Sequence, residues 1–227
     1  MIYNGYSPTE LEEKAVELLR KFDSERLTKC KPLDVYEVIE KCLDVPYDWK
    51  YITPDQSILG LTAFQPGTLW IWPEPCYVDG MMPQQIYLDE GTIFIDSTLT
   101  EKESRGPENF TVMHEVFHQV LHWDYFRGIG SAYARNYTLD VYESQVMPQI
   151  SLPVCEYQAN TCAAAFLMPA QLVENRLHHY HVDYILDFAR SEDRKLLVGL
   201  ADEFSVSKTA MKYRLINLGH ARQEYWG

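Results

Sequence analysis

The stretch His114-Glu-Val-Phe-His118 constrains this chain most, because it sets two imidazoles and a carboxylate at a fixed spacing. Apolar residues recur around it at the spacing of an amphipathic helix. Residues four apart lie on one helix face, so His114 and His118 can reach a common metal ion. Glu115 lies beside that face, where a carboxylate can act as a general base on water instead of as a ligand. The alternative is a helix whose histidines have no shared role.

A zinc ion with two histidine ligands needs a third protein ligand and an open position. His122 continues the four-residue spacing, but about 12 Å of helix axis separates it from His114, so we assign it to packing or to the surroundings of the ligands. A better candidate is Glu156, in a second predicted helix within 151–169. Asn160, one turn further, could orient a ligand histidine. From the residues alone, Glu156 fits a ligand and an exposed first-turn carboxylate equally well.

Two blocks of the chain resemble the ImmA/IrrE group of metallopeptidases. The first is Phe110-Thr-Val-Met-His-Glu-Val-Phe-His-Gln-Val-Leu-His122, preceded by Arg105. The second is Glu156-Tyr-Gln-Ala-Asn-Thr-Cys-Ala-Ala-Ala-Phe-Leu-Met-Pro169. A weaker likeness extends the covered region to roughly residues 32–219, whereas the segment 124–153 is longer than the family's usual connection.

The resemblance implies that His114, His118 and Glu156 bind Zn2+ and that Glu115 is the catalytic base. It also implies a protein substrate, usually a helix-turn-helix transcriptional repressor whose cleavage switches on genes. The alternative function is a regulatory protein- or DNA-binding module on a peptidase-like fold, with little or no turnover. A purely structural zinc site would need a fourth ligand, and the sequence offers no evident one.

The periodicity predicts an α+β fold in three parts. Residues 1–44 form an N-terminal helical cap with helices that start near Ser7 and Asp34. Residues 45–190 form a zincin-type metallopeptidase core, and residues 191–227 form a helical region similar to a helix-turn-helix. The core contains a small, mostly antiparallel sheet with strands near 45–51, 58–64, 68–72, 86–88 and 92–95. The last strand leads to the metal helix, so we expect a sheet edge beside the site.

Peptide hydrolysis also needs a group that stabilises the developing oxyanion, and neither motif supplies it. The candidates are Tyr157, His178, His179 and His181. A second metal site at the three histidines is not favoured, because adjacent helical residues diverge by about 100°. The segment 69–83, rich in aromatic residues, Met and Pro, is assigned to a small core under a loop in preference to a peptide groove.

The charge and cysteine content limit the partners and the compartment. The net charge of −13 disfavours a general nucleic-acid surface, and although Lys208, Lys212 and Arg214 make the last helix basic, no basic arm flanks it. DNA contact is therefore not expected. Five cysteines without a C-x-x-C pair indicate reduced thiols. With no signal-peptide pattern and no apolar run near the roughly 20 residues of a membrane span, we expect a soluble, cytoplasmic protein of undefined oligomeric state.

Overall fold

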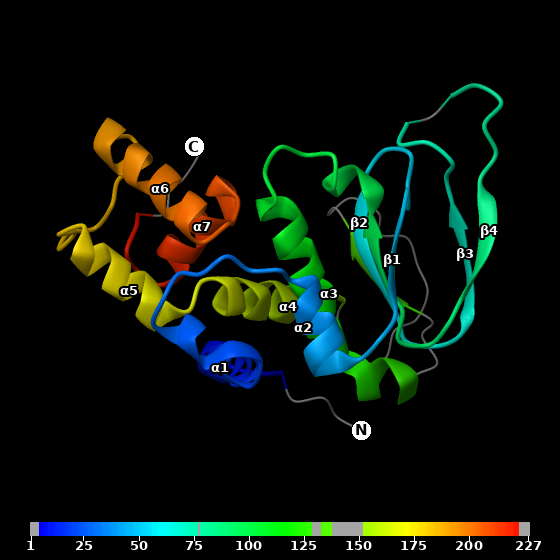
Figure 1. The fold of residues 1–227 in the computed structure, drawn as a ribbon, viewed down its shortest axis with the longest axis horizontal. Helices are drawn as coiled ribbons and strands as arrows, with labels where there is room; N and C mark the ends of the chain where they lie inside the picture. Colours follow the sequence, from blue (N-terminus) through cyan, green and yellow to red (C-terminus); the bar gives the residue numbers. More distant parts are fainter. Residues whose placement is uncertain (1–4, 77, 129–132, 138–151, 223–227) are drawn as a thin grey trace.

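A computed structural model describes residues 5–76, 78–128, 133–137 and 152–222, which form an α+β fold (Figure 1). The helices of this part of the chain are α1 (Pro8–Asp23), η1 (Ser24–Leu27), α2 (Tyr36–Val38), η2 (Ile39–Leu43), η3 (Ser97–Leu99), α3 (Gly106–Gly128), α4 (Leu152–Leu167), α5 (Ala170–His179), α6 (Ser191–Glu203) and α7 (Lys208–Asn217). The strands are β1 (Tyr47–Lys50), β2 (Ile58–Ala63), β3 (Gly67–Ile71), β4 (Gln84–Leu88), β5 (Ile93–Asp96) and β6 (Tyr133–Tyr137). The predicted fold class is confirmed. Among the described residues, no helix has the length and apolar character needed to cross a membrane.

The main sheet has the strand order β1-β5-β2-β6. β5 pairs parallel with β1 and antiparallel with β2, and β2 pairs antiparallel with β6 on its other side. The sheet is mostly antiparallel, as predicted. The expectation that the strand before the metal helix forms a sheet edge is wrong, because β5 lies between β1 and β2. Strand order depends on contacts between distant residues, which hydrophobic periodicity does not report.

β3 and β4 form a separate two-stranded sheet that extends from the main one (Figure 1). Leu69 and Leu88 are buried in a small hydrophobic cluster that includes residues of β2 and β5. Trp70 and Met82 are 56% and 75% exposed. In the segment 69–83, only the side chains that point inward therefore belong to the small core that the sequence predicts. Side chains in a strand alternate in direction, so the others are exposed.

The N-terminal helix begins with the capping box that the sequence predicts. The Ser7 backbone N–H donates to Glu10 Oε2 at 2.8 Å, and the Ser7 hydroxyl accepts from the Glu10 N–H at 3.3 Å. The second helix starts near Asp34, as predicted, but it is not a regular α-helix throughout. Asp34 accepts from the Tyr36 N–H at 3.1 Å, but regular α-helix ends at Val38 and continues as a wider helical turn to Asp44, which has a φ of 54°.

α3 lies between the sheet on one side and α4 on the other (Figure 1). Several residues of α4 that face the core are small, and Ala159, Cys162 and Ala163 are fully buried. Small side chains let two helix backbones approach closely. The sulfhydryl of Cys162 also donates to the Leu11 carbonyl at 3.2 Å, which attaches α1 to the same layer.

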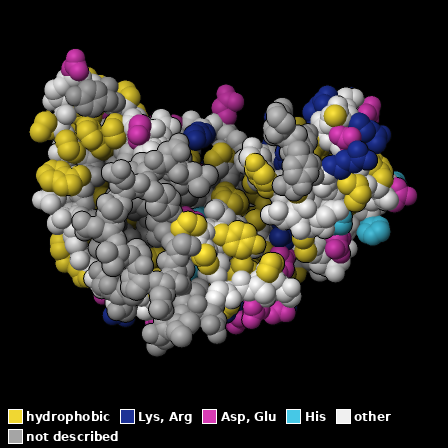
Figure 2. Space-filling model, turned by 180° about the vertical axis from the view of Figure 1, so that it is seen from behind, with side chains coloured by type: hydrophobic (Ala, Val, Ile, Leu, Met, Phe, Trp, Pro, Cys, Tyr) yellow, Lys and Arg dark blue, Asp and Glu magenta, His cyan; other side chains and the backbone are white. Residues whose placement is uncertain are grey.

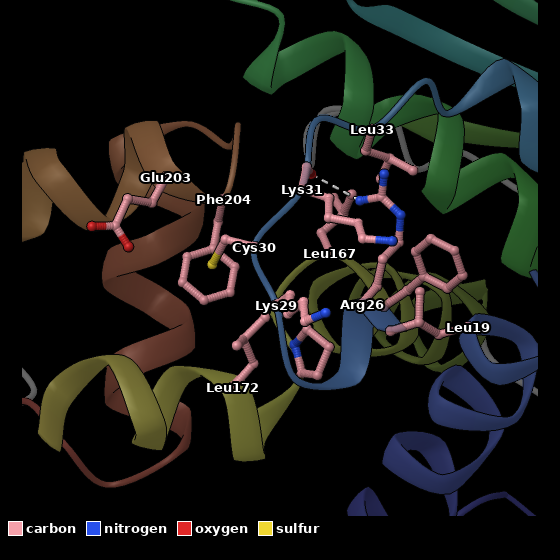
Figure 3. A pocket seen from close by; sticks show the side chains of 12 residues that line it. Leu19, Arg26, Lys29, Cys30, Lys31, Leu33, Leu167, Leu172, Glu203 and Phe204 are labelled. Atoms are coloured by element: carbon pink, nitrogen blue, oxygen red, sulfur yellow. Dashed lines mark hydrogen bonds between the residues drawn. The ribbon is translucent and has the colours of Figure 1, made fainter. Parts of the chain in front are cut away.

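The C-terminal helices pack onto this layer through the turn between α6 and α7. Asn109 of α3 donates from Nδ2 to the Ser205 carbonyl at 2.9 Å, and Ser207 caps α7 by accepting from the Ala210 N–H at 3.0 Å. The segment after η1 also contacts the C-terminal helices. Cys30 of this segment and Phe204, which follows α6, help to line a cavity of about 20 Å³ (Figure 3).

Gly106→Ala tests the contact between the start of α3 and the turn before α7. A Cβ at Gly106 would lie 2.5 Å from the Ser207 nitrogen and the Val206 carbonyl carbon, both rigid backbone atoms. We expect the free energy of unfolding to fall by about 1–3 kcal/mol, measured by urea denaturation followed by circular dichroism. Gly199→Ala in α6 is the control, because a Cβ there meets nothing within 4 Å and alanine favours a helix by about 1 kcal/mol. Equal stability of the two variants would contradict the packing argument.

Candidate metal centre

Three side chains from α3 and α4 converge. In the described part of the chain, ligand atoms of His114, His118 and Glu156 all lie within 4.8 Å of one another. The two oxygens of Glu156 lie 3.1 Å from His114 Nε2 and 3.3 Å from His118 Nε2. Both imidazoles are fully buried, and the Glu156 side chain is 18% exposed. The structure thus brings together the three residues that the sequence analysis selects as metal ligands.

Hydrogen bonds orient the far side of each imidazole. His114 Nδ1 lies 2.9 Å from Asn160 Oδ1, and because an amide oxygen only accepts, this nitrogen carries the proton. His118 Nδ1 lies 3.0 Å from His122 Nδ1. His122 Nε2 lies 3.0 Å from Gln158 Oε1 and donates to it, so the other nitrogen of this neutral ring accepts from His118. Both Nε2 atoms therefore direct lone pairs toward Glu156.

This arrangement fits a bound cation. The Nε2 atoms of His114 and His118 are 2.9 Å apart, and two lone pairs at that distance repel each other unless a positive charge lies between them. Burial raises the pKa of Glu156, but the two adjacent histidines lower it to about 2, so the carboxylate is ionised. Two imidazole nitrogens and one carboxylate oxygen are a donor set typical of a transition-metal site with an open position.

His122 is buried and has a role distinct from that of the ligands. Burial, and to a lesser extent the neighbouring His118, lower the pKa of His122 to about 3, so its ring is neutral at physiological pH. A neutral ring can accept from one neighbour and donate to another, which is the arrangement found between His118 and Gln158. The structure therefore places His122 behind the ligands, where the helical rise predicted it.

Glu115 is buried beside the ligand face of α3, against β2. Thr62 donates from Oγ1 to Glu115 Oε2 at 2.7 Å, whereas Oε1 has no hydrogen-bond partner among the described residues. Gly60 leaves room for this carboxylate, since a Cβ there would lie 2.5 Å from Oε1. Burial raises the pKa of Glu115 to about 7. A carboxylate with that pKa can both take up and release a proton near neutral pH.

The predicted oxyanion candidates lie in two different places. Tyr157 follows Glu156 on α4 and is 52% exposed. His178 and His179 lie in the last turn of α5, and His181 follows with a φ of 56°. The end of α5 points away from α3 (Figure 1). The structure does not bring these three histidines to the candidate ligands.

Sequence reasoning missed three residues that complete the site, namely Gly60, Thr62 and Gln158. A glycine inside a strand is a recognisable signal of close approach by another group, so Gly60 could have been noticed. Thr62 and Gln158 carry no such signal. A threonine in a strand and a glutamine in a helix are ordinary, and their roles follow only from the packing of β2 and α4 against α3.

Gln158→Met tests the hydrogen-bond chain behind His118. The change keeps the side-chain length but removes the acceptor of His122 Nε2, so His122 is no longer held to accept from His118. Loss of such an outer partner typically costs about 10–100-fold in metal affinity, and we expect a loss of that size in a competition titration with a chelator. Gln171→Met, at an exposed position of α5, should leave the affinity unchanged. An unchanged metal affinity in Gln158→Met would contradict the proposed role of the hydrogen bonds from His118 to His122 and from His122 to Gln158.

The comparison with known families agrees with this geometry. A profile of peptidase family M78, described as the IrrE N-terminal-like domain, matches residues 82–216. The matched region runs from just before β4 into α7 and includes all three candidate ligands and Glu115. A comparison with curated proteins gives no match. Because the profile covers more than half of the chain and agrees with the resemblance noted from the two motifs, the chain belongs to the IrrE N-terminal-like peptidase family M78.

Proposed function

We propose that this protein is a zinc-dependent metalloendopeptidase. The observation that carries the proposal is the convergence of His114, His118 and Glu156 beside a buried carboxylate that is not one of the ligands. Membership of a peptidase family supports the same reaction class. Two histidines and one glutamate are a ligand set that zinc adopts in hydrolytic sites with an open position.

In this proposal, each residue around the metal centre has a separate role in peptide hydrolysis. Zinc at this position would act as a Lewis acid that lowers the pKa of water and polarises the scissile carbonyl. Glu115 takes a proton from the attacking water and passes it to the leaving amine, a task that suits a pKa of about 7. Thr62 holds one oxygen of Glu115, which leaves the other free to receive the proton. Tyr157 is the candidate for oxyanion stabilisation that lies next to a ligand.

The substrate in this proposal is a cytoplasmic protein, namely a helix-turn-helix transcriptional repressor whose cleavage relieves repression of its genes. Support for this substrate comes from the family resemblance of the two motif blocks. The alternative, a regulatory binding module with little turnover, predicts that the biological effect does not depend on Glu115. Mutation of that residue therefore separates the two functions.

Glu115→Gln and Glu156→Ala should fail in different ways. Glu115→Gln keeps all three ligands but removes the proton acceptor, so we expect normal zinc content and cleavage reduced by about 10²–10⁴-fold. Glu156→Ala removes a ligand, so zinc content itself should fall sharply. The measurements are zinc by atomic absorption and cleavage of a candidate repressor or a degenerate peptide library by mass spectrometry.

Glu17→Ala, at an exposed position of α1, is the control for both variants. Retention of cleavage by Glu115→Gln would refute the peptidase mechanism. Wild-type protein that binds no zinc, or Glu156→Ala protein that binds it normally, would refute the ligand assignment.

Gly60→Ala tests whether β2 positions the Glu115 carboxylate, and it changes none of the candidate metal ligands. Its new Cβ would lie 2.5 Å from Glu115 Oε1 and 2.9 Å from the Thr111 Cγ2 methyl, so the carboxylate must move. A displaced catalytic group can cost about 100-fold in rate, and we expect a loss of this order in kcat with unchanged zinc content. Gly67→Ala in β3 is the matched control, because nothing lies within 4 Å of a Cβ there. Full activity in Gly60→Ala would show that Glu115 is not positioned by β2.

A further inference from the structure

A groove lies between α3, α4, α7 and the start of α1. Its volume is about 870 Å³, at the upper end of the roughly 300–1,000 Å³ typical of ligand sites. Most of the groove wall is apolar or uncharged, with Phe110 and Ala164 on one side and Ala210 on the other. Seen from behind, hydrophobic side chains are exposed between the body of the molecule and the C-terminal lobe (Figure 2). An exposed apolar area of this kind marks a surface that binds something.

The groove lies next to the candidate metal centre, although none of the three candidate ligands lines it. Asn160 lines it and also accepts the hydrogen bond from His114 Nδ1. Tyr157, which lines the same wall, directly follows the ligand Glu156. Thr111 lies in the groove wall, and its Cγ2 methyl would be 2.9 Å from a Cβ on Gly60. Gly60 is the residue that leaves room for the Glu115 carboxylate. The groove wall therefore shares helices α3 and α4 with the candidate ligands.

One face of α7 forms the far wall. Thr209, Tyr213 and Asn217 recur every four residues and all line the groove, so they lie on one helix face. Tyr213 is 60% exposed. This helix occupies the position of a recognition helix in a helix-turn-helix unit. Here its uncharged face is directed at the peptidase groove.

The charges of the groove wall cancel. Arg214 donates from Nη2 to Glu12 at 2.6 Å and from Nε to the Met168 carbonyl at 2.9 Å, and its side chain is 5% exposed. Arg214 and Glu12 are the two charged residues of the described groove wall. Lys212 of α7 does not line the groove but lies over the Phe188 ring, 5.7 Å from its centroid. An uncharged, partly apolar occupant is complementary to such a wall, whereas a phosphate backbone finds no free cation there.

We propose that this groove binds an uncharged, apolar-rich stretch of the substrate polypeptide on one side of the scissile bond, and that α7 contacts that stretch. The inference rests on the proposed peptidase function. It assigns to the helix-turn-helix-like region a role in substrate selection. Tyr213 supplies a large, partly exposed ring for apolar side chains, and Thr209 and Asn217 supply neutral hydrogen-bonding groups beside it.

The test measures binding without turnover. Zinc-loaded Glu115→Gln protein is titrated, by fluorescence polarisation, with a labelled peptide of Ala, Leu, Val and Thr and with a matched peptide that carries Lys and Glu in place of some of these residues. We expect the uncharged peptide to bind more tightly. In the same background Tyr213→Ala should weaken its binding by roughly tenfold, a loss of the size typical of a buried aromatic contact. Thr209→Glu, a tolerated change at an exposed helix start, should weaken it as well.

Tyr87→Ala is the matched control, because Tyr87 is 66% exposed on β4 and does not line the groove. Equal affinity in Tyr213→Ala and Tyr87→Ala, equal binding of the two peptides, or no binding of either peptide would overturn the inference. A DNA duplex that displaces the uncharged peptide would overturn it too. Wild-type protein that binds the peptide through Tyr213 but never cleaves it would refute the peptidase function while leaving the groove assignment intact.

Discussion

Hydrogen bonds from buried histidines of α3 to amide oxygens of α4 hold the candidate metal centre together. An unsatisfied buried polar group costs about 1–3 kcal/mol, so the imidazoles of α3 are tolerated only because Asn160 and Gln158 accept from them. Those acceptors reach the histidines because Ala159 and Ala163 let the two helices approach closely. The third candidate ligand, Glu156, comes from the same helix. One helix pair therefore supplies the ligands, the groups that orient them and much of the core.

The proposed general base, Glu115, depends on a different neighbour. Glu115 is one residue from a candidate ligand, yet its carboxylate is held by β2 through Thr62 and by the space left at Gly60. A buried carboxylate is costly to ionise, which is why its pKa rises to about 7. The candidate ligand histidines are thus oriented by α4 and the proposed base by the sheet. This separation lets two carboxylates close to one centre behave differently, because Glu156 of α4 stays ionised while Glu115 of α3 can exchange a proton.

Local features of this structure could be predicted from the sequence, and features that depend on distant contacts could not. The capping box at Ser7, the helical spacing of His114 and His118 and the turn before α7 follow from residues close together in the chain. The role of Asn160 could also be predicted, because this residue lies one helical turn from Glu156. The strand β6, the interior position of β5 and the acceptor role of Gln158 depend on which elements pack together. Periodicity indicates that a face is buried but does not identify its partner.

The C-terminal hairpin illustrates the same limit for function. Its helix-turn-helix-like pattern and its basic residues suggest DNA recognition when they are considered alone. In the structure the turn abuts Gly106 of α3, and the charge of Arg214 is neutralised by Glu12. Lys and Arg side chains gather at the outer end of the C-terminal lobe, apart from the hydrophobic area (Figure 2). The family profile, which extends to residue 216, includes most of α7. The hairpin thus lies within the region matched by the family profile, and the neutral face of α7 lines the groove, which is the basis for proposing a polypeptide partner and not a nucleic acid.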